Sequence, residues 1–136
     1  MILTNEICDK LCEAALEKST EMGFDISFAV YDESGLPRVF SRLGGALVLS
    51  TTLVPGKAYT SAVTQCKTKD VAKASKEGGS LMAIQTNDPR ITLVAGGYPL
   101  FVNGKIAGGI GVGGGTENQD CAVAEYVVEI FNGLVN

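Results

Sequence analysis

The chain has 136 residues, of which 46% are hydrophobic and 19% charged, a composition typical of one globular domain spanning residues 1–136. Its net charge of −4 argues against nucleic acids and anionic membranes as partners, because both are bound through clustered Lys and Arg. Residues 1–10 lack the basic and apolar regions of a secretory signal, and no apolar run reaches the roughly 18 residues of a membrane span. We therefore expect a cytoplasmic protein.

The first half of the chain predicts a helix followed by a hairpin. Residues 4–22 have the apolar spacing of an amphipathic helix, with Thr4 as its N-cap and Gly23 after its last turn. The segment "DISFAVYD" alternates like a strand, "DESG" is a turn, and "LPRVFSR" is the returning strand. Pro37 is expected at a strand start or an edge, because it cannot donate a ladder hydrogen bond.

The second half predicts helices, then strands, then a last helix. Residues 50–76 are expected to form two helices or one helix broken near Thr68, and residues 117–134 a terminal helix. Asn103-Gly104 is a strong hairpin signal between apolar runs. Three strands are expected in a meander, near residues 90–95, 98–102 and 105–112. The fold class is thus α+β, with a five-stranded, mostly antiparallel sheet flanked by helices.

Cysteine and histidine content bears on metals and redox chemistry. The chain has no histidine, and its four cysteines are expected to be reduced packing residues: Cys8, Cys12, Cys66 and Cys121. We expect no metal site. A Ser–His or Cys–His pair is excluded, and no other nucleophile and base can be paired from the sequence.

The run "GKIAGGIGVGGGTENQD" over residues 104–120 raises the question of a nucleotide site. Gly109, Gly111 and Gly114 have dinucleotide-loop spacing, but no second strand can follow, so this interpretation fails. As a strand, residues 105–112 would have one face almost bare of side chains. Glycine in a strand marks close approach by a ligand or another backbone. Either a helix or a flat ligand could lie on this face.

The end of the glycine run predicts a capped helix. Thr116 and Gln119 have the spacing of a capping box. The glycines before them leave backbone N–H groups free to bind an anion, whereas Glu117 and Asp120 would repel one.

The same run carries a resemblance to a known family. "GGYPLFVNGKIAGGIGVGGGTENQD" resembles the signature of the GlcG/HbpS family, which includes the C-terminal domain of PduO proteins. Gly113 stands where the family usually has serine. "FAVYDESGLPRVFSRLGGA" and "GKAYTSA" resemble two further segments of that family, so the similarity covers nearly the whole chain. The matching signature positions are Gly96, Gly97, Pro99, Gly104, Gly108, Ile110, Gly111, Val112, Gly114, Gly115, Thr116, Gln119 and Asp120.

The resemblance implies a profilin-like α/β/α domain with a five-stranded antiparallel sheet, and homo-oligomers built from dimers. It also implies binding of a small molecule, of haem or corrinoid type or a metabolite of diol or glycolate use. The cofactor itself is unknown. A His-ligated haem is excluded because the chain has no histidine. Haem iron can also take Cys, Met or Tyr, and the candidates for such a ligand are Met22, Met82, Tyr59 and Tyr98.

These observations favour a binding or accessory protein over an enzyme. Lys57 is the expected polar anchor, and Arg42 and Arg90 could bind ligand carboxylates. The pocket is expected between the glycine-faced strand and a helix, lined by Gly97, Pro99, Gly109, Gly111, Gly113 and Thr116. Two alternatives remain open: an enzyme of haem or corrinoid metabolism, and a purely structural oligomer.

Overall fold

The computed structural model describes residues 2–136. It contains four α-helices, one 3-10 turn and four strands within that range. In chain order these are α1 (Asn5–Met22), β1 (Ser27–Asp32), β2 (Pro37–Arg42), α2 (Ser50–Thr64), α3 (Thr68–Ala74), η1 (Ile84–Thr86), β3 (Gly97–Val102), β4 (Lys105–Gly113) and α4 (Glu117–Val135).

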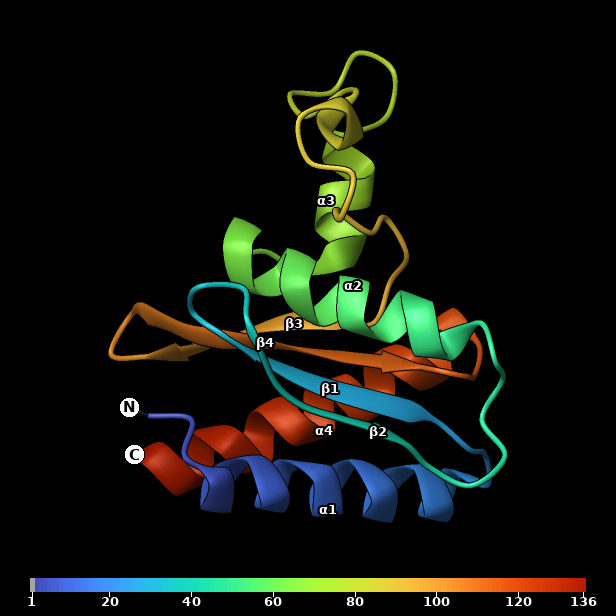
Figure 1. The fold of residues 1–136 in the computed structure, drawn as a ribbon, viewed down its shortest axis with the longest axis vertical. Coiled ribbons are helices and arrows are strands. Elements are labelled where there is room, and N and C mark those ends of the chain that lie inside the picture. Colours follow the sequence, from blue (N-terminus) through green and yellow to red (C-terminus); the bar gives the residue numbers. More distant parts are fainter. Residues whose placement is uncertain (1) are drawn as a thin grey trace.

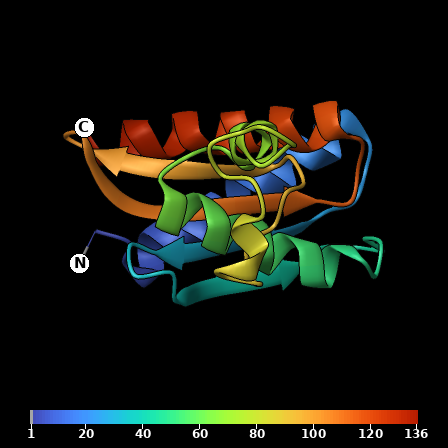
Figure 2. The ribbon, with the colours of Figure 1, turned by 90° about the horizontal axis from the view of Figure 1, so that it is seen from above.

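The strands form one antiparallel sheet in the order β2-β1-β4-β3, with helices on both faces (Figures 1 and 2). Helices α1 and α4 cover one face, and α2 lies across the other (Figure 1). Helix α3 and the loop after it rise from α2, away from the sheet. The α+β prediction is confirmed.

The expectation of a fifth strand at residues 90–95 is wrong. This segment lies beside α2 instead of pairing in the sheet, since the Thr92 amide donates to Thr60 Oγ1 at 2.8 Å. The Ile91 amide donates to Asp88 O at 3.1 Å, which closes a turn at the start of the segment. A long-range helix contact therefore satisfies backbone groups that the sequence pattern assigned to a ladder.

The predicted helix ends are confirmed by their caps. Thr4 Oγ1 accepts from the Ile7 amide at 3.2 Å, and Gly23 has a left-handed φ of 80°. At α4, the Thr116 hydroxyl accepts from the Gln119 amide, and Gln119 Oε1 accepts from the Thr116 amide at 2.9 Å. The capping box thus fixes where the glycine run turns into α4.

The region predicted as two helices or a broken helix forms two helices. Helix α2 ends at Thr64, the next residue Gln65 is left-handed with a φ of 58° and a ψ of 28°, and α3 begins at Thr68. A backbone in this conformation cannot continue a right-handed helix.

The two faces of the sheet carry side chains of different size. Large residues, including Phe28 and Ile110, pack with Phe131 of α4 in the main core. The opposite face packs Ala29 against α2 in a much smaller cluster. Small side chains let α2 approach the sheet backbone closely.

The glycines of β4 make this approach possible. A Cβ atom added at Gly109 would lie 2.6 Å from Ala58 O, and one at Gly111 would lie 2.9 Å from the Ala58 amide nitrogen. Both atoms belong to the backbone of α2 and could not move aside. Of the two partners that the sequence left open for this strand face, the structure therefore shows the helix.

Candidate functional site

Lys57 of α2 is buried, with 1% of its surface exposed, and is paired inside the protein. Its Nζ donates to Val112 O at 2.8 Å and lies 3.5 Å from Asp120 Oδ2 at the start of α4. The other carboxylate oxygen of Asp120 accepts from the Gly115 amide at 2.9 Å. One buried ion pair thus joins α2, β4 and α4.

Glycines of the signature surround this ammonium group. A Cβ atom added at Gly96 would lie 3.0 Å from Lys57 Nζ, and one at Gly113 would lie 3.1 Å from it. Side chains at these positions would compress the amine. These glycines therefore leave a chamber for the Lys57 head group, while Gly109 and Gly111 admit the helix that carries it.

Burial acts on both members of the pair. Desolvation lowers the pKa of Lys57, and the nearby Asp120 carboxylate opposes that shift. Desolvation also raises the pKa of Asp120, against the opposing effects of Lys57 and the Gly115 amide. Both directions mean that the charged pair is less favoured here than it would be in water.

A hollow of about 210 Å³ opens beside this pair, and we call it the Lys57 hollow. Lys57 and Asp120 both contribute to its lining. Leu47 and Leu49, on its wall, are 62% and 57% exposed. The other lining residues are Ser50, Leu53, Val94, Ala95, Gly114, Gly115 and Glu117.

A neighbouring hollow of about 570 Å³ shares part of this wall. It has Val94, Ala95 and Glu117 in common with the Lys57 hollow, and it adds three lysines of α3 and the chain after it: Lys69, Lys73 and Lys76.

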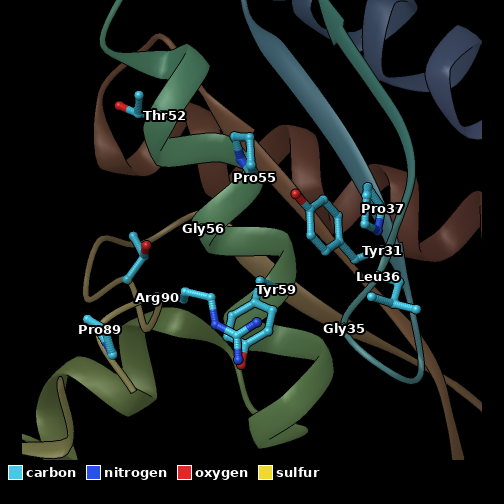
Figure 3. Close-up of a pocket in the computed structure, with 11 residues that line it drawn as sticks. Tyr31, Gly35, Leu36, Pro37, Thr52, Pro55, Gly56, Tyr59, Pro89 and Arg90 are labelled. Carbon is cyan, nitrogen blue, oxygen red and sulfur yellow. The ribbon is translucent and has the colours of Figure 1, made fainter. Parts of the chain in front are cut away.

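A larger cleft than the Lys57 hollow lies between the β1–β2 hairpin, α2 and the loop before β3 (Figure 3). Its volume is about 490 Å³, and we call it the Arg90 cleft. Tyr31 of β1 points toward Pro55 of α2 across it, and Arg90 lies over the ring of Tyr59 (Figure 3). The remaining lining residues are Gly35, Leu36, Pro37, Thr52, Gly56, Pro89 and Thr92.

Arg90 is held in place by an aromatic ring and a carboxylate. Its guanidinium carbon is 4.2 Å from the centre of the Tyr59 ring. Its Nε and Nη2 atoms lie 3.1 and 3.3 Å from the Asp88 carboxylate oxygens, and the Tyr59 hydroxyl donates to the same carboxylate. Hydrogen bonds from Tyr59 and Arg90 lower the pKa of Asp88 to about 2, so it is ionised at neutral pH.

The predicted site residues are separated by the fold. Lys57 lines one hollow and Arg90 the other cleft. Arg42 lines neither the Lys57 hollow nor the Arg90 cleft. Its Nε and Nη2 atoms donate to Ala46 O at 2.9 and 2.6 Å. The backbone positions serve the fold: Gly97 donates to Thr68 Oγ1 at 2.9 Å, Pro99 is opposite Gly109 in the β3–β4 ladder, and Thr116 caps α4.

The predicted pocket between the glycine strand and a helix is not supported by this geometry. Helix α2 lies directly on Gly109 and Gly111, and neither lines the three hollows described above. The sequence did not predict that Tyr31 and the Tyr59–Asp88–Arg90 cluster line a cleft. The only available signal was the turn sequence "NDPR", which places Asp88 two residues before Arg90.

Within residues 2–136, no group of three or more His, Cys, Asp or Glu side chains lies close enough together to hold a metal ion. Across the same range, each helix is too short or too polar to cross a membrane.

The comparisons with known proteins identify the family. Residues 3–129 match the family described as "Haem degrading protein HbpS-like", and the chain belongs to that family. It is 34% identical over 133 residues to an uncharacterised 15.0 kDa protein in the dhaT-dhaS intergenic region of Citrobacter freundii, covering 97% of this chain and 94% of that protein. It is 28% identical to the corrinoid adenosyltransferase PduO of the same organism, but spans only 40% of its length.

Two solved structures have the same fold. The Klebsiella pneumoniae protein ORFY superposes with a TM-score of 0.90 at 28% identity, covering 96% of this chain and 90% of that one. The crystal structure of a PduOC–haem complex superposes with a TM-score of 0.88 at 26% identity, covering 93% of each chain. The family thus includes a domain that binds haem, and it suggests small-molecule binding.

The residues of this chain do not fit a haem held through its iron. No histidine is present, and two of the remaining candidate ligands are already engaged. The Tyr59 hydroxyl donates to Asp88, and the Tyr98 hydroxyl donates to Glu125 at 2.7 Å. Met82 lies 57% exposed and Met22 packs against the main hydrophobic core, and neither lines any of the three hollows. Any tetrapyrrole bound here would be held by contacts to its ring and carboxylates.

Proposed function

We propose that this protein is a binding or accessory protein for a small carboxylate-bearing molecule, and that the Arg90 cleft is its site. The observation that carries the proposal is the guanidinium of Arg90, fixed flat over Tyr59 at the wall of a 490 Å³ cleft. Cavities of about 300–1,000 Å³ with a few placed polar groups are typical ligand sites.

Arg90 keeps hydrogen-bonding capacity for a ligand. A guanidinium has five N–H donors, and Asp88 accepts from only two of its nitrogens. Its side chain is 69% exposed, so its other donors are accessible to an incoming anion. A carboxylate bonded to arginine by charge-assisted hydrogen bonds would be oriented as well as attracted. Tyr59 and Asp88 then act as positioning residues that hold the guanidinium in one place.

Haem and small hydroxy acids both present carboxylates, so each is a reasonable probe. The haem complex of a related domain supports the first, and glycolate tests whether a carboxylate alone is enough for binding. Because this chain has no histidine, we expect binding to depend on the carboxylates and the ring rather than on iron.

The proposal is tested by titrating the purified protein with haem, iron-free protoporphyrin IX and glycolate. We expect haem and the iron-free porphyrin to bind with similar affinity. Arg90→Gln should weaken binding of the probe that binds best by about 10- to 100-fold, the equivalent of one charge-assisted hydrogen bond. Arg38→Gln is the matched control, because Arg38 bonds to Asn5 of α1 on the other side of the sheet.

Equal loss of affinity in both arginine variants, or no binding of any probe, would contradict the proposal. Conversion of bound haem into a new absorbing species would favour the alternative of an enzyme of haem metabolism.

A further inference from the structure

The Lys57–Asp120 pair has no part in the Arg90 cleft, yet both of its members line a separate hollow. We propose that Lys57 is a covalent site that forms an imine with an aliphatic aldehyde entering the Lys57 hollow. This inference is independent of the carboxylate-binding function. It rests on the chamber around the amine, the neighbouring carboxylate and the apolar entrance.

The Lys57 amine occupies space that side chains at two neighbouring glycines would otherwise fill. Gly96 and Gly113 flank Nζ without side chains, at positions where Cβ atoms would lie 3.0 and 3.1 Å away. Among residues 2–136, Val112 O and Asp120 Oδ2 are the two acceptors near Nζ, while a lysine ammonium has three donors. One donor position on the nitrogen therefore has no acceptor, and since Lys57 is 1% exposed, an aldehyde would have to reach it through the hollow that Lys57 and Asp120 line.

Asp120 is placed to take the proton that blocks the amine. Only a neutral amine attacks a carbonyl, and burial of a lysine in apolar surroundings promotes that form. Asp120 Oδ2 lies 3.5 Å from Nζ, and it is 4% exposed. Because burial lowers the pKa of Lys57 and raises that of Asp120, transfer of one proton within the pair costs less than it would in water.

The step balances within the pair and the aldehyde. The Lys57 ammonium gives a proton to the Asp120 carboxylate, and the free amine attacks the carbonyl carbon to form the C–N bond. Protonated Asp120 returns its proton to the carbonyl oxygen, giving a carbinolamine. Loss of that hydroxyl as water, with a proton from nitrogen, gives the imine. Overall, the lysine nitrogen loses two protons, which leave with the carbonyl oxygen as one water, and the product is a protonated imine beside an Asp120 that is again a carboxylate. No oxidant or reductant is needed.

The entrance selects the class of aldehyde. Leucine side chains from the loop before α2 and from α2 itself, Leu47, Leu49 and Leu53, line the hollow together with Val94. Such a wall favours an unbranched alkyl chain over a polyol or a charged sugar. The volume of about 210 Å³ suits a short chain, so pentanal is the appropriate probe.

Reductive trapping tests the proposal directly. The full-length protein is treated with limiting pentanal and cyanoborohydride, and the modified lysines are identified by peptide mass spectrometry. We expect Lys57 to be alkylated at least tenfold faster than exposed lysines such as Lys10. Trapping at the exposed lysines with an unmodified Lys57 would overturn the proposal.

Two variants test the route and the proton acceptor. Leu49→Glu places a charge at the exposed entrance and should slow trapping of Lys57 by about tenfold while leaving Lys10 unchanged. Leu16→Glu, at a position 47% exposed on α1, is the matched control and should trap Lys57 normally. Asp120→Asn favours the neutral amine, because it removes the carboxylate that opposes the lowering of the Lys57 pKa, but it also removes the group that carries the proton to the carbonyl oxygen. If Asp120 is that carrier, trapping of Lys57 should slow in this variant despite the more neutral amine. Undiminished trapping in Leu49→Glu, or undiminished or faster trapping in Asp120→Asn, with folding verified by circular dichroism, would contradict the mechanism.

Discussion

At the scale of single residues, buried charge distinguishes Lys57 from Arg90. Lys57 is paired with Asp120 inside the protein, whereas Arg90 is paired with Asp88 at an accessible wall. The sequence placed both among the candidates, Lys57 through the family segment and Arg90 as a cation flanking the sheet. It could not show which was buried, because burial depends on the packing of α2 against β4.

Replacing Lys57 should lower the free energy of unfolding, because the buried Asp120 carboxylate then has no charged partner. Lys57→Met strands Asp120 in the interior, and loss of one partner of a buried pair costs about 3–5 kcal/mol at pH 7. The measurement is urea denaturation at several pH values.

The pH dependence of that loss has a definite sign. Without Lys57, the folded-state pKa of Asp120 rises further above its unfolded value, because only the Gly115 amide then opposes the effect of burial. The folded variant therefore gains protons relative to the unfolded chain as pH falls, so its stability deficit should shrink from pH 7 to pH 5. A deficit that stays constant over this range would contradict the assignment of the loss to Asp120.

At the scale of elements, the contact between α2 and β4 determines the architecture. The helices, caps and hairpins were predictable because their signals are local: Thr4, Gly23, Asn103-Gly104 and the Thr116 box all act within a few residues. The absence of a strand at residues 90–95 could not be predicted, because the residue that bonds to this segment, Thr60, lies 32 residues away from Thr92 in the chain. The Arg90 cleft escaped prediction for the same reason, because Tyr59 and Asp88 are 29 residues apart.

The helix–sheet contact makes a prediction about two glycines. Gly111→Ala should destabilise the protein by about 1–3 kcal/mol or more, because its Cβ atom would press on the backbone of α2. Gly133→Ala is the control: nothing lies within 4 Å of its Cβ position in α4, so helix propensity should stabilise it by about 1 kcal/mol. Denaturation midpoints measure both. Equal effects at the two sites would contradict close packing of α2 on β4.

At the scale of the whole molecule, the sheet ends in two edge strands, and one of them, β3, is bonded at its start to Thr68 of α3. The edge strands are β2 and β3, and they carry the exposed aromatic residues Phe40 and Phe101, which are 42% and 38% exposed. Edge strands pair with other chains unless they are protected. The homo-oligomer expected from the family resemblance stays a prediction, for which these two strands are the candidate interfaces.

Native mass spectrometry tests that expectation. We predict an even-numbered assembly of the 14.2 kDa chain, and we expect Phe40→Lys or Phe101→Lys to shift it toward smaller species. A chain that remains monomeric at tens of micromolar would show that neither edge serves as an interface.

The central claim is that Arg90 receives the carboxylate of a small ligand, and a crystal structure of the protein with its best-binding probe tests it most directly. We predict the carboxylate within hydrogen-bond distance of the Arg90 guanidinium, in the cleft between Tyr31 and Tyr59 (Figure 3). A probe bound elsewhere, with the Arg90 cleft filled only by water, would contradict the account.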